Sequence, residues 1–353
     1  MSTLITGADG YLARRLTEAL LRDGETVVLA ARGEGLSRLA SRHAGEASVT
    51  LVEADLGAPD ALAGIDPAKL TRIVHAAAVT RFNVDRETAR RGNVEGTAQV
   101  CDLAERSPNL ERLTLISTLY TAGRHLGEIP ETRHGDAGFV NHYEWSKHEA
   151  EELACSRGLP LSVLRLPTIV CDDDTGLSIT QYNAFHRTLK LYFYGLLSLV
   201  PGLAETPLSL ASAEFAVRAV LALLDAPEGI VHVCPDAEAS TDLGTMIDTA
   251  FAVFERDPSF RRRRLLRPLH VDHAGFRDLV SVAEALGKGP INQAVGVVAP
   301  YAEQLYLPKT FDNRGLHARW PGYRAPDPVR LVESVCQTLV LTRWGRGPRS
   351  PRD

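Results

Sequence analysis

The sequence lacks three features that would narrow its function class at once: a long apolar run, a disulfide framework and a strong excess of basic charge. The apolar stretch 189–203 contains Lys190, Gly195 and Pro201, so it is too short and too interrupted to span a bilayer. The formal net charge of -5 argues against a broad nucleic-acid surface. We therefore expect no membrane span and no nucleic-acid partner.

Cysteine and acidic residues give no sign of a metal site. The five cysteines are odd in number, and no two of them have the spacing of metal ligands. The acidic run Asp172–Asp174 is interpreted as loop charge, because three successive side chains point in different directions. We interpret the thiols as reduced, in a cytoplasmic protein without a signal peptide, since a glycine-rich loop already begins at residue 6. No metal is predicted.

Short apolar runs alternate with amphipathic stretches along the first half of the chain. The runs predict strands at residues 2–6, 26–31, 49–53, 72–78, 113–117 and 161–166, with another at 229–234. The stretches between them predict helices at residues 35–42, 94–106 and 142–157, and a later one at 213–224. This alternation predicts an α/β fold with a Rossmann-type, doubly wound parallel sheet that binds its ligand at the carboxyl ends of the strands.

The alternation of strands and helices ends after residue 166. We predict a dinucleotide-binding domain of residues 1–171 plus 207–236, and a smaller, mostly helical substrate-binding cap of residues 172–206 plus 237–345. Residues 346–353 form a basic tail, and Arg261–Arg264 form a second basic run. Both are interpreted as solvated charge, or else as a docking point for an acidic partner such as a carrier protein.

A glycine-rich segment follows the first predicted strand. Gly7 and Gly10 allow the backbone to approach a pyrophosphate, and Ala13 allows the following helix to pack closely on the strand. The second predicted strand ends in Ala31 and Arg32, with no acid before Glu34 to hold a ribose 2′-hydroxyl. This arrangement favours NADPH over NADH.

Three basic and acidic side chains near the second and third strands are candidate contacts of that cofactor. Arg32, with Arg38, is expected to bind the 2′-phosphate through charge-assisted hydrogen bonds, and Asp55 is expected to meet the adenine amino group.

Tyr143 and Lys147 are the most informative pair in the chain. They stand four residues apart in a predicted helix, so the phenol and the ammonium lie on one face, one turn apart. A carbonyl reductase needs an acid for the growing alkoxide, and a nearby ammonium favours the phenolate of a tyrosine whose ordinary pKa is near ~10. Thr118, at the end of the fifth predicted strand, is placed to polarise the carbonyl oxygen.

These residues resemble those of the extended short-chain dehydrogenase/reductases, in the branch of the fatty acyl-CoA reductases and carrier-protein thioester reductases. The resemblance is good over residues 1–180 and loose beyond. It rests on Thr6–Ala13, Asp55–Leu56, His75–Ala78 with Arg81–Phe82, Asn93–Thr97, Ile116–Thr118, Gly127–Glu131, Tyr143–Lys147 with Glu149–Glu151, and Arg165–Val170 with Thr175–Gly176. The departures are Cys171–Asp174 and Ala213–Ala216, which lie near the expected substrate cleft.

The resemblance implies that Thr118, Tyr143 and Lys147 are the catalytic residues, with Ser117 as the close alternative to Thr118. It implies that Asn93 binds cofactor and supports the helix, and that Pro167 to Ile169 touch the nicotinamide carboxamide. The candidate cofactor-binding residues are Gly7, Asp9, Gly10, Tyr11, Leu12, Arg32, Arg38, Asp55, Leu56, Ala76, Ala77, Ala78, Asn93, Ser117, Lys147, Pro167, Thr168 and Ile169.

The function that the resemblance implies is an NADPH-dependent reduction of an acyl thioester, bound to CoA or a carrier protein, to an aldehyde and then to an alcohol. The stretch 189–203 is expected to line an acyl channel or to pack in the core. The alternatives are a reductase or epimerase acting on a ketone or nucleotide-sugar, and a non-catalytic NADP(H)-binding module. The protein is expected to act as a free-standing reductase, with a homodimer formed through the Tyr–Lys helix as a further expectation.

Overall fold

The computed structural model describes residues 2–345, so the predicted basic tail 346–353 lies outside the described residues. A seven-stranded sheet forms its base, with the strands in the order β12-β7-β5-β4-β1-β2-β3. Every neighbouring pair is parallel. The strands are β1 (Ser2–Thr6), β2 (Val27–Ala31), β3 (Val49–Glu53), β4 (Leu70–His75), β5 (Arg112–Thr118), β7 (Leu161–Leu166) and β12 (Gly229–His232). The predicted Rossmann-type fold is confirmed.

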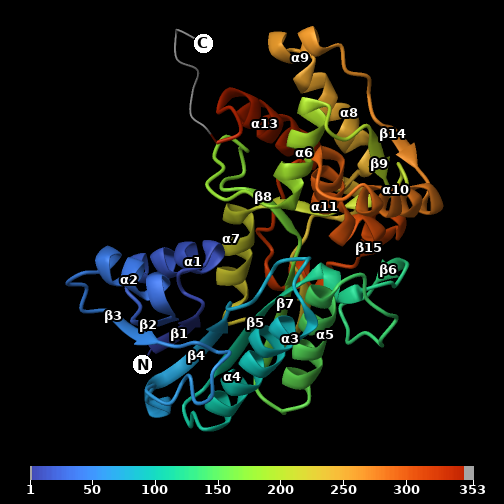
Figure 1. The fold of residues 1–353 in the computed structure, drawn as a ribbon. Helices are drawn as coiled ribbons and strands as arrows, with labels where there is room; N and C mark the ends of the chain where they lie inside the picture. Colours follow the sequence, from blue (N-terminus) through green and yellow to red (C-terminus); the bar gives the residue numbers. More distant parts are fainter. Residues whose placement is uncertain (1, 346–353) are drawn as a thin grey trace.

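Helices cover both faces of this sheet (Figure 1). Successive residues of β1 show the reason, because Ile5 packs in one apolar cluster with Leu16 and Phe215, while Leu4 packs in another with Val100 and Ala154. The first face carries α1 (Tyr11–Arg22), α2 (Gly33–Arg42) and α7 (Ala213–Leu223), and the second carries α3 (Arg86–Ala89), α4 (Gly96–Glu105) and α5 (His142–Cys155). A strand buried on both faces is mostly apolar, which explains why the strands were readable as near-continuous apolar runs.

The strand order reverses between β1 and β4, which lie side by side at the centre of the sheet. The glycine loop follows β1, and Ala76–Ala78 follow β4, so both loops lie at the carboxyl edge of this point. Doubly wound folds bind their ligands in the crevice that such a reversal opens.

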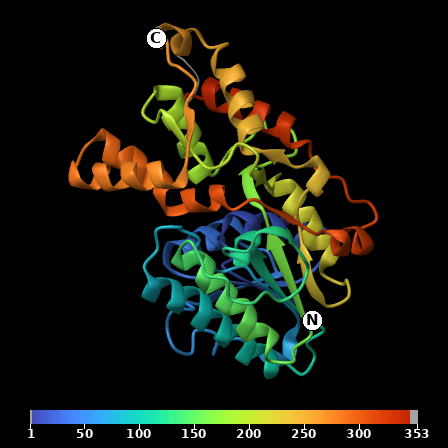
Figure 2. The same ribbon diagram turned by 90° about the vertical axis from the view of Figure 1, so that its right-hand side faces the viewer.

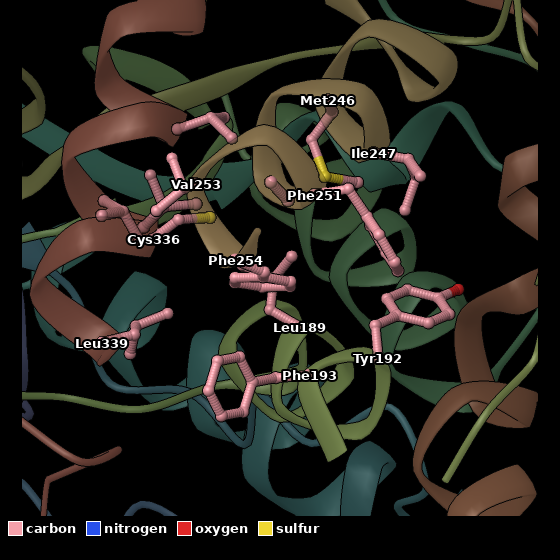
Figure 3. Close-up of a cluster of buried hydrophobic side chains, with 14 of the residues drawn as sticks. Leu189, Tyr192, Phe193, Met246, Ile247, Phe251, Val253, Phe254, Cys336 and Leu339 are labelled. Carbon is pink, nitrogen blue, oxygen red and sulfur yellow. The ribbon is translucent and has the colours of Figure 1, made fainter. Parts of the chain in front are cut away.

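The remaining elements form a second layer above the carboxyl edge of the sheet (Figure 1). Its helices are α6 (Ala184–Tyr194), α8 (Leu243–Phe254), α9 (Pro258–Arg263), α10 (His273–Ala285), α11 (Pro290–Ala302) and α13 (Pro328–Leu341). We call this layer the cap. Its core is rich in aromatic side chains, and the Phe193 ring lies against those of Phe254, Phe260 and Trp344. Figure 3 shows Phe193 of α6 and Phe254 of α8 within this core.

Short strand pairs, which the sequence did not reveal, hold the cap to itself and to the sheet. They are β8 (Thr168–Cys171) with β11 (Leu210–Ser212), β9 (Leu199–Pro201) with β14 (Leu269–Val271), β10 (Pro207–Leu208) with β13 (Thr241–Asp242), and β6 (Gly127–Ile129) with β15 (Lys309–Phe311). Single 3₁₀ turns lie at Pro67–Lys69, Leu119–Ala122, Ala237–Ala239 and Glu303–Tyr306.

The chain returns to the sheet late in its course. Helix α12 (Arg314–Arg319) packs on β12 and α7, and Leu316 and Tyr323 join the apolar cluster that contains Phe215. Helices α10 and α11 form a hairpin that projects from the cap on the side opposite to α12 (Figure 2). Within residues 2–345, no helix is both long enough and apolar enough to pass through a bilayer.

Candidate active site

The glycine loop is shaped by one close approach of two backbones. Gly7 has a φ of +63°, and a Cβ atom there would lie 2.6 Å from the Cα of Ala77, so only glycine fits. The Gly10 amide donates to the Gly7 carbonyl oxygen at 2.8 Å, which closes the turn directly before α1. The free amides at the start of α1 therefore face the carboxyl edge of the sheet, as a pyrophosphate site requires.

Tyr11 ties this loop to the cap. Its hydroxyl donates a hydrogen bond to the Asp172 carboxylate, which also accepts from Ser178 at 2.6 Å and from Thr180 at 2.8 Å. Arg15 completes the cluster through an ion pair of 2.8 Å with Asp172. Asp172 lies in the loop after β8, as the loop-charge interpretation has it, but its carboxylate is nearly buried and organises that segment.

The predicted 2′-phosphate contacts form ion pairs at the edge of β2 and β3. The Arg32 guanidinium lies 3.0 Å from the Asp55 carboxylate, and that of Arg38 lies 3.0 Å from Asp9. Both arginine side chains remain exposed, at 67% and 63%. Two cations thus stand at the strand edge where an NAD-type fold would present an acid.

Helix α5 and strand β5 bring the three predicted catalytic side chains together. Asn141 begins α5 by accepting a hydrogen bond from the Glu144 amide at 3.0 Å. The Lys147 Nζ donates to the Ile116 carbonyl oxygen at 2.8 Å, which fixes the helix on the strand. The Thr118 side chain lowers the pKa of the Tyr143 phenol against the effect of burial, and both side chains line one cavity, so the phenol lies by the end of β5.

A buried asparagine supports this arrangement from behind. Asn93 lies in a π-helical turn, Arg90–Glu95, which precedes α4 and overlaps only the start of the helix predicted at residues 94–106. Its side-chain amide donates to the Val79 carbonyl oxygen at 3.0 Å and to the Ser146 hydroxyl at 2.8 Å, and its oxygen accepts from the Val79 amide at 2.7 Å. Asn93 therefore holds α5 in place; a cofactor contact stays a prediction.

The Ser117 side chain belongs to a different hydrogen-bond network. Its hydroxyl bonds to Glu151, whose carboxylate pairs with the fully buried Arg165 at 2.7 Å. The Thr118 side chain, by contrast, acts on the pKa of Tyr143. The geometry thus favours Thr118 over Ser117 as the group that polarises a carbonyl oxygen.

Burial controls the protonation of the pair on α5. It raises the pKa of the Tyr143 phenol above its ordinary value, and the Thr118 side chain only partly opposes this. The sequence argument expected Lys147 to favour the phenolate, but burial sets the direction of the pKa shift of Tyr143. Burial also lowers the pKa of Lys147 to about 8, while the Glu151 charge acts in the opposite direction. Tyr143 is therefore protonated at neutral pH and Lys147 is charged.

One cavity of about 460 Å³ connects these groups. It runs from the start of α1, past the end of β5 and the part of α5 that carries Tyr143 and Lys147, into the cap. The candidate residues that line it are Gly10, Tyr11, Leu12, Ala76, Ala78, Ser117, Thr118, Tyr143, Lys147, Pro167, Thr168 and Ile169. The candidates that lie outside its lining are Gly7, Asp9, Arg32, Arg38, Asp55, Leu56, Ala77 and Asn93.

The inner part of the cavity is apolar and comes from the cap. Its walls include Leu189, Tyr192, Leu243, Met246, Ile247, Val298 and Leu305. Figure 3 shows Tyr192 of α6 beside Met246 and Ile247 of α8, at the margin of the aromatic core. The stretch 189–203 therefore both lines the cavity and packs in the core, as the two sequence interpretations proposed separately.

Sequence comparison identifies the family. Residues 5–220, more than half of the chain, match the family described as male sterility protein. The chain belongs to the male sterility protein family. This protein is an NAD(P)-dependent oxidoreductase of the extended short-chain dehydrogenase/reductase type, as the sequence predicted.

A curated relative of this male sterility family protein is a 4-hydroxy-2-methyl-3-oxo-4-farnesyl-3,4-dihydroquinoline-1-oxide ketoreductase of Stigmatella aurantiaca. The two are 29% identical over 180 residues, which are 50% of this chain and 52% of the relative. The match therefore spans about half the length of that ketoreductase.

Solved structures share the fold of this family member along nearly its whole length. The terminal R domain of the myxalamid PKS-NRPS pathway has a TM-score of 0.76 at 22% identity, covering 99% of this chain and 92% of that domain. An archaeal thiolation-reductase di-domain has a TM-score of 0.72 at 16% identity, covering 97% and 76%. Yeast methylglyoxal/isovaleraldehyde reductase Gre2 has a TM-score of 0.66 at 17% identity, covering 98% and 100%.

Several cavity residues had no prior assignment from the sequence. They are Thr80, Phe82, Tyr120, Gln181, Asn183, Thr188 and Tyr301. Tyr120 could have been predicted as a cavity residue, because it follows Thr118 by two positions and so lies directly after the end of a strand. Tyr301 and Val298 had none, since only tertiary packing of α11 brings them to the cavity.

Proposed function

We propose that this protein is an NADPH-dependent reductase of acyl thioesters, with Tyr143 as the proton donor. The observation that carries the proposal is the shape of the cavity. Its outer part holds Thr118, Tyr143 and Lys147, and its inner part is a deep apolar chamber walled by the cap. A thioester carbonyl at the hydroxyls would place its acyl chain along that apolar wall.

The residues at the carboxyl edge fit a bound dinucleotide phosphate. Gly7 leaves the space that a Cβ would fill, and α1 offers its first amides beside it. Arg32 and Arg38 would bind a 2′-phosphate by exchanging their exposed carboxylate partners for it. When bound, NADPH supplies the hydride for the reaction.

The protein groups then act on the substrate oxygen. Thr118 and Tyr143 would donate hydrogen bonds to the thioester carbonyl, and Tyr143 would pass its proton to the oxygen as the carbon becomes tetrahedral. Lys147 holds positive charge one turn away and would stabilise the phenolate that remains. The product of this step is a hemithioacetal, which collapses to an aldehyde and a thiol. A second reduction would give the alcohol.

A carrier-protein or CoA thioester is the proposed form of the substrate. Two structural neighbours support it, because one is a terminal reductase domain of a PKS-NRPS pathway and the other is a thiolation-reductase di-domain. A ketone is the second candidate substrate, favoured by the sequence identity with the Stigmatella ketoreductase. The same three side chains would serve both.

The deciding experiment follows NADPH oxidation at 340 nm with a panel of acyl-CoA, acyl-pantetheine and acyl-carrier thioesters beside matched ketones. Turnover of thioesters with formation of an aldehyde, identified by mass spectrometry, supports the proposal. Turnover of ketones alone moves the assignment to a ketoreductase. Cofactor binding without turnover of any substrate would leave a non-catalytic NADP(H)-binding module.

A further inference from the structure

A second phenol lies in the same cavity as Tyr143 and has no part in the steps above. Tyr120 stands in the 3₁₀ turn directly after β5, two residues beyond Thr118. Its hydroxyl pairs with the Thr168 hydroxyl at 3.1 Å, and both residues line the cavity. Tyr120 thus reaches across from the end of β5 to the start of β8.

One aromatic ring separates the two phenols. Phe82 meets the Tyr120 ring edge-on, with centroids 5.5 Å apart and an interplanar angle of 87°. It meets the Tyr143 ring in the same way, at 5.6 Å and 77°. The two tyrosines therefore flank the same side chain, and a carbonyl carbon held at Tyr143 has Tyr120 in the same chamber.

Tyr120 has a hydrogen to donate. In a pair of hydroxyls, one O–H hydrogen makes the bond and the other stays available for a further acceptor. Burial raises the pKa of the Tyr120 phenol, so it remains protonated, while the hydrogen bond with Thr168 acts in the opposite direction. Either hydroxyl of the pair can be the donor, so Tyr120 keeps its own hydrogen for another acceptor whenever Thr168 donates to it.

Thioester reduction needs a group that ketone reduction does not. After the hydride and the first proton are added, the hemithioacetal must break its C–S bond. The hydroxyl proton returns to the Tyr143 phenolate, the C=O bond forms, and the electron pair of the C–S bond leaves with sulfur. Negative charge thus develops on sulfur, at a position one bond from the carbonyl carbon.

We propose that Tyr120 donates a hydrogen bond to this departing sulfur, and is therefore a further catalytic residue of the thioester reaction. This inference rests on the proposed function. Tyr120 keeps its proton throughout, and the thiolate takes its own proton from water after release, so no additional reactant is needed. Thr168 is then a positioning residue, because it acts on sulfur only through Tyr120.

The test is the variant Tyr120→Phe with three substrates that share one acyl chain: an alkyl thioester of N-acetylcysteamine, an aryl thioester of thiophenol, and the free aldehyde. The alkyl thiolate is a basic leaving group and should lose about 10- to 100-fold in kcat, the effect of one hydrogen bond to a developing charge. The aryl thiolate is a weak base and leaves without help, and the aldehyde has no leaving group. Both should change by less than about threefold on the same reasoning.

A control separates this effect from damage to the fold. Tyr323 is also buried and donates its hydroxyl to the Cys234 carbonyl oxygen at 2.6 Å, outside the cavity. Tyr323→Phe should keep the wild-type ratio of the alkyl to the aryl thioester rate, whatever it does to stability. Thr168→Val should lower that ratio in the same direction as Tyr120→Phe, but less.

Two outcomes would overturn the assignment of Tyr120. An equal loss with both thioesters would show that Tyr120 acts before C–S cleavage or only supports the fold, and an unchanged alkyl rate would show no role. Failure of the proposed function is a different result, because wild-type protein would then reduce neither thioester. The ratio of the two thioester rates decides the inference even if the aldehyde is not a substrate.

Discussion

The Nζ atom of Lys147 lies 2.8 Å from the carbonyl oxygen of Ile116, and this hydrogen bond joins the helix that carries Tyr143 to the strand that ends in Thr118. The bond is made by the same ammonium that is expected to assist the phenol. Lys147 therefore has two tasks, holding the site together and supplying charge. The two can be separated by experiment, because only the second depends on pH.

Tyr143→Phe should abolish most turnover while leaving the cofactor bound. The variant keeps the ring that packs against Phe82 but lacks the proton that the substrate oxygen needs. Loss of a general acid costs about 10²- to 10⁴-fold in kcat. The rate is measured by NADPH oxidation, and binding by NADPH fluorescence titration. Retained turnover would remove Tyr143 from the proton-donor role.

The rate should fall on the alkaline side above pH about 8, where Lys147 loses its charge because burial has lowered its pKa. The limb should approach a tenfold fall per pH unit. Lys147→Arg keeps a cation at every working pH, so its slower turnover should show no fall near pH 8. The same alkaline limb in Lys147→Arg would assign it to another group.

The alkaline fall in rate cannot arise because deprotonation of Lys147 unfolds the protein. The pKa of Lys147 is lowered on folding from 10.5 to about 8, so between these values the unfolded chain binds more protons than the folded chain. The contribution of Lys147 to the free energy of unfolding therefore rises with pH across this window. Urea unfolding at pH 8 and pH 9.5, compared between wild type and Lys147→Arg, checks the sign.

Gly7→Ala should destabilise the protein and weaken NADPH binding together. A Cβ at Gly7 would lie 2.6 Å from the Ala77 Cα, and its φ of +63° is unfavourable for alanine by about 1–2 kcal/mol before any clash. Gly64→Ala is the matched control, because nothing lies within 4 Å of the Cβ that it adds. Thermal unfolding and NADPH titration of both variants provide the comparison. Equal behaviour of the two would contradict the close approach at Gly7.

The double variant Arg32→Ala/Arg38→Ala should reduce the preference for NADPH. Losing two charge-assisted hydrogen bonds to a 2′-phosphate should lower kcat/KM for NADPH by roughly 100-fold and leave that for NADH nearly unchanged. Arg330→Ala is the control, since that side chain is 87% exposed and lies on α13. An equal fall in kcat/KM for NADPH and NADH would show that the two arginines do not bind the 2′-phosphate.

Met246 should set the acyl chain length that the cap accepts. Met246→Trp fills the inner chamber, so the KM of long-chain thioesters should rise while that of short-chain thioesters stays unchanged. Met246→Ala enlarges the chamber and should extend the range to longer chains. Melting temperatures serve as the control, because overpacking alone costs typically about 1–3 kcal/mol. A uniform loss across all chain lengths would mean that acyl chains do not reach Met246.

The dinucleotide half of the fold could be predicted from the sequence because its signals are local. Residues 161–166 were predicted as a strand with the bounds that the structure has, since a parallel strand buried on both faces is mostly apolar. Residues 49–53 were predicted with the right bounds as well, although β3 is a partly exposed edge strand. Tyr143 and Lys147 could be placed on one face of a helix because four residues are about one helical turn. Thr118 could be placed beside them because strand ends meet at one edge of the sheet, and the catalytic role of all three stays a prediction.

The cap half could not be predicted in the same way, because its contacts join distant segments. Asp172 looked like one of three solvated acids, and only the fold shows that Tyr11, 161 residues away in the sequence, donates to it. The effect of burial on the pKa of Tyr143 likewise depends on how Phe82, Val79 and Val84 pack around the ring. The π-helical turn around Asn93 had no signal in the hydrophobic pattern, which was equally compatible with an α-helix.

The edge strand β12 pairs with β7, although more than sixty residues separate the two strands in the sequence. Helix α12, which packs on β12, follows it by about a further eighty residues. Contacts of such long sequence separation make folding slow, because a large loop must close before they form. Until then the β7 edge of the sheet stays open to pairing with other chains. We expect refolding yields that depend steeply on protein concentration, with early intermediates that already protect the amides of β1, β4 and β5 from hydrogen exchange.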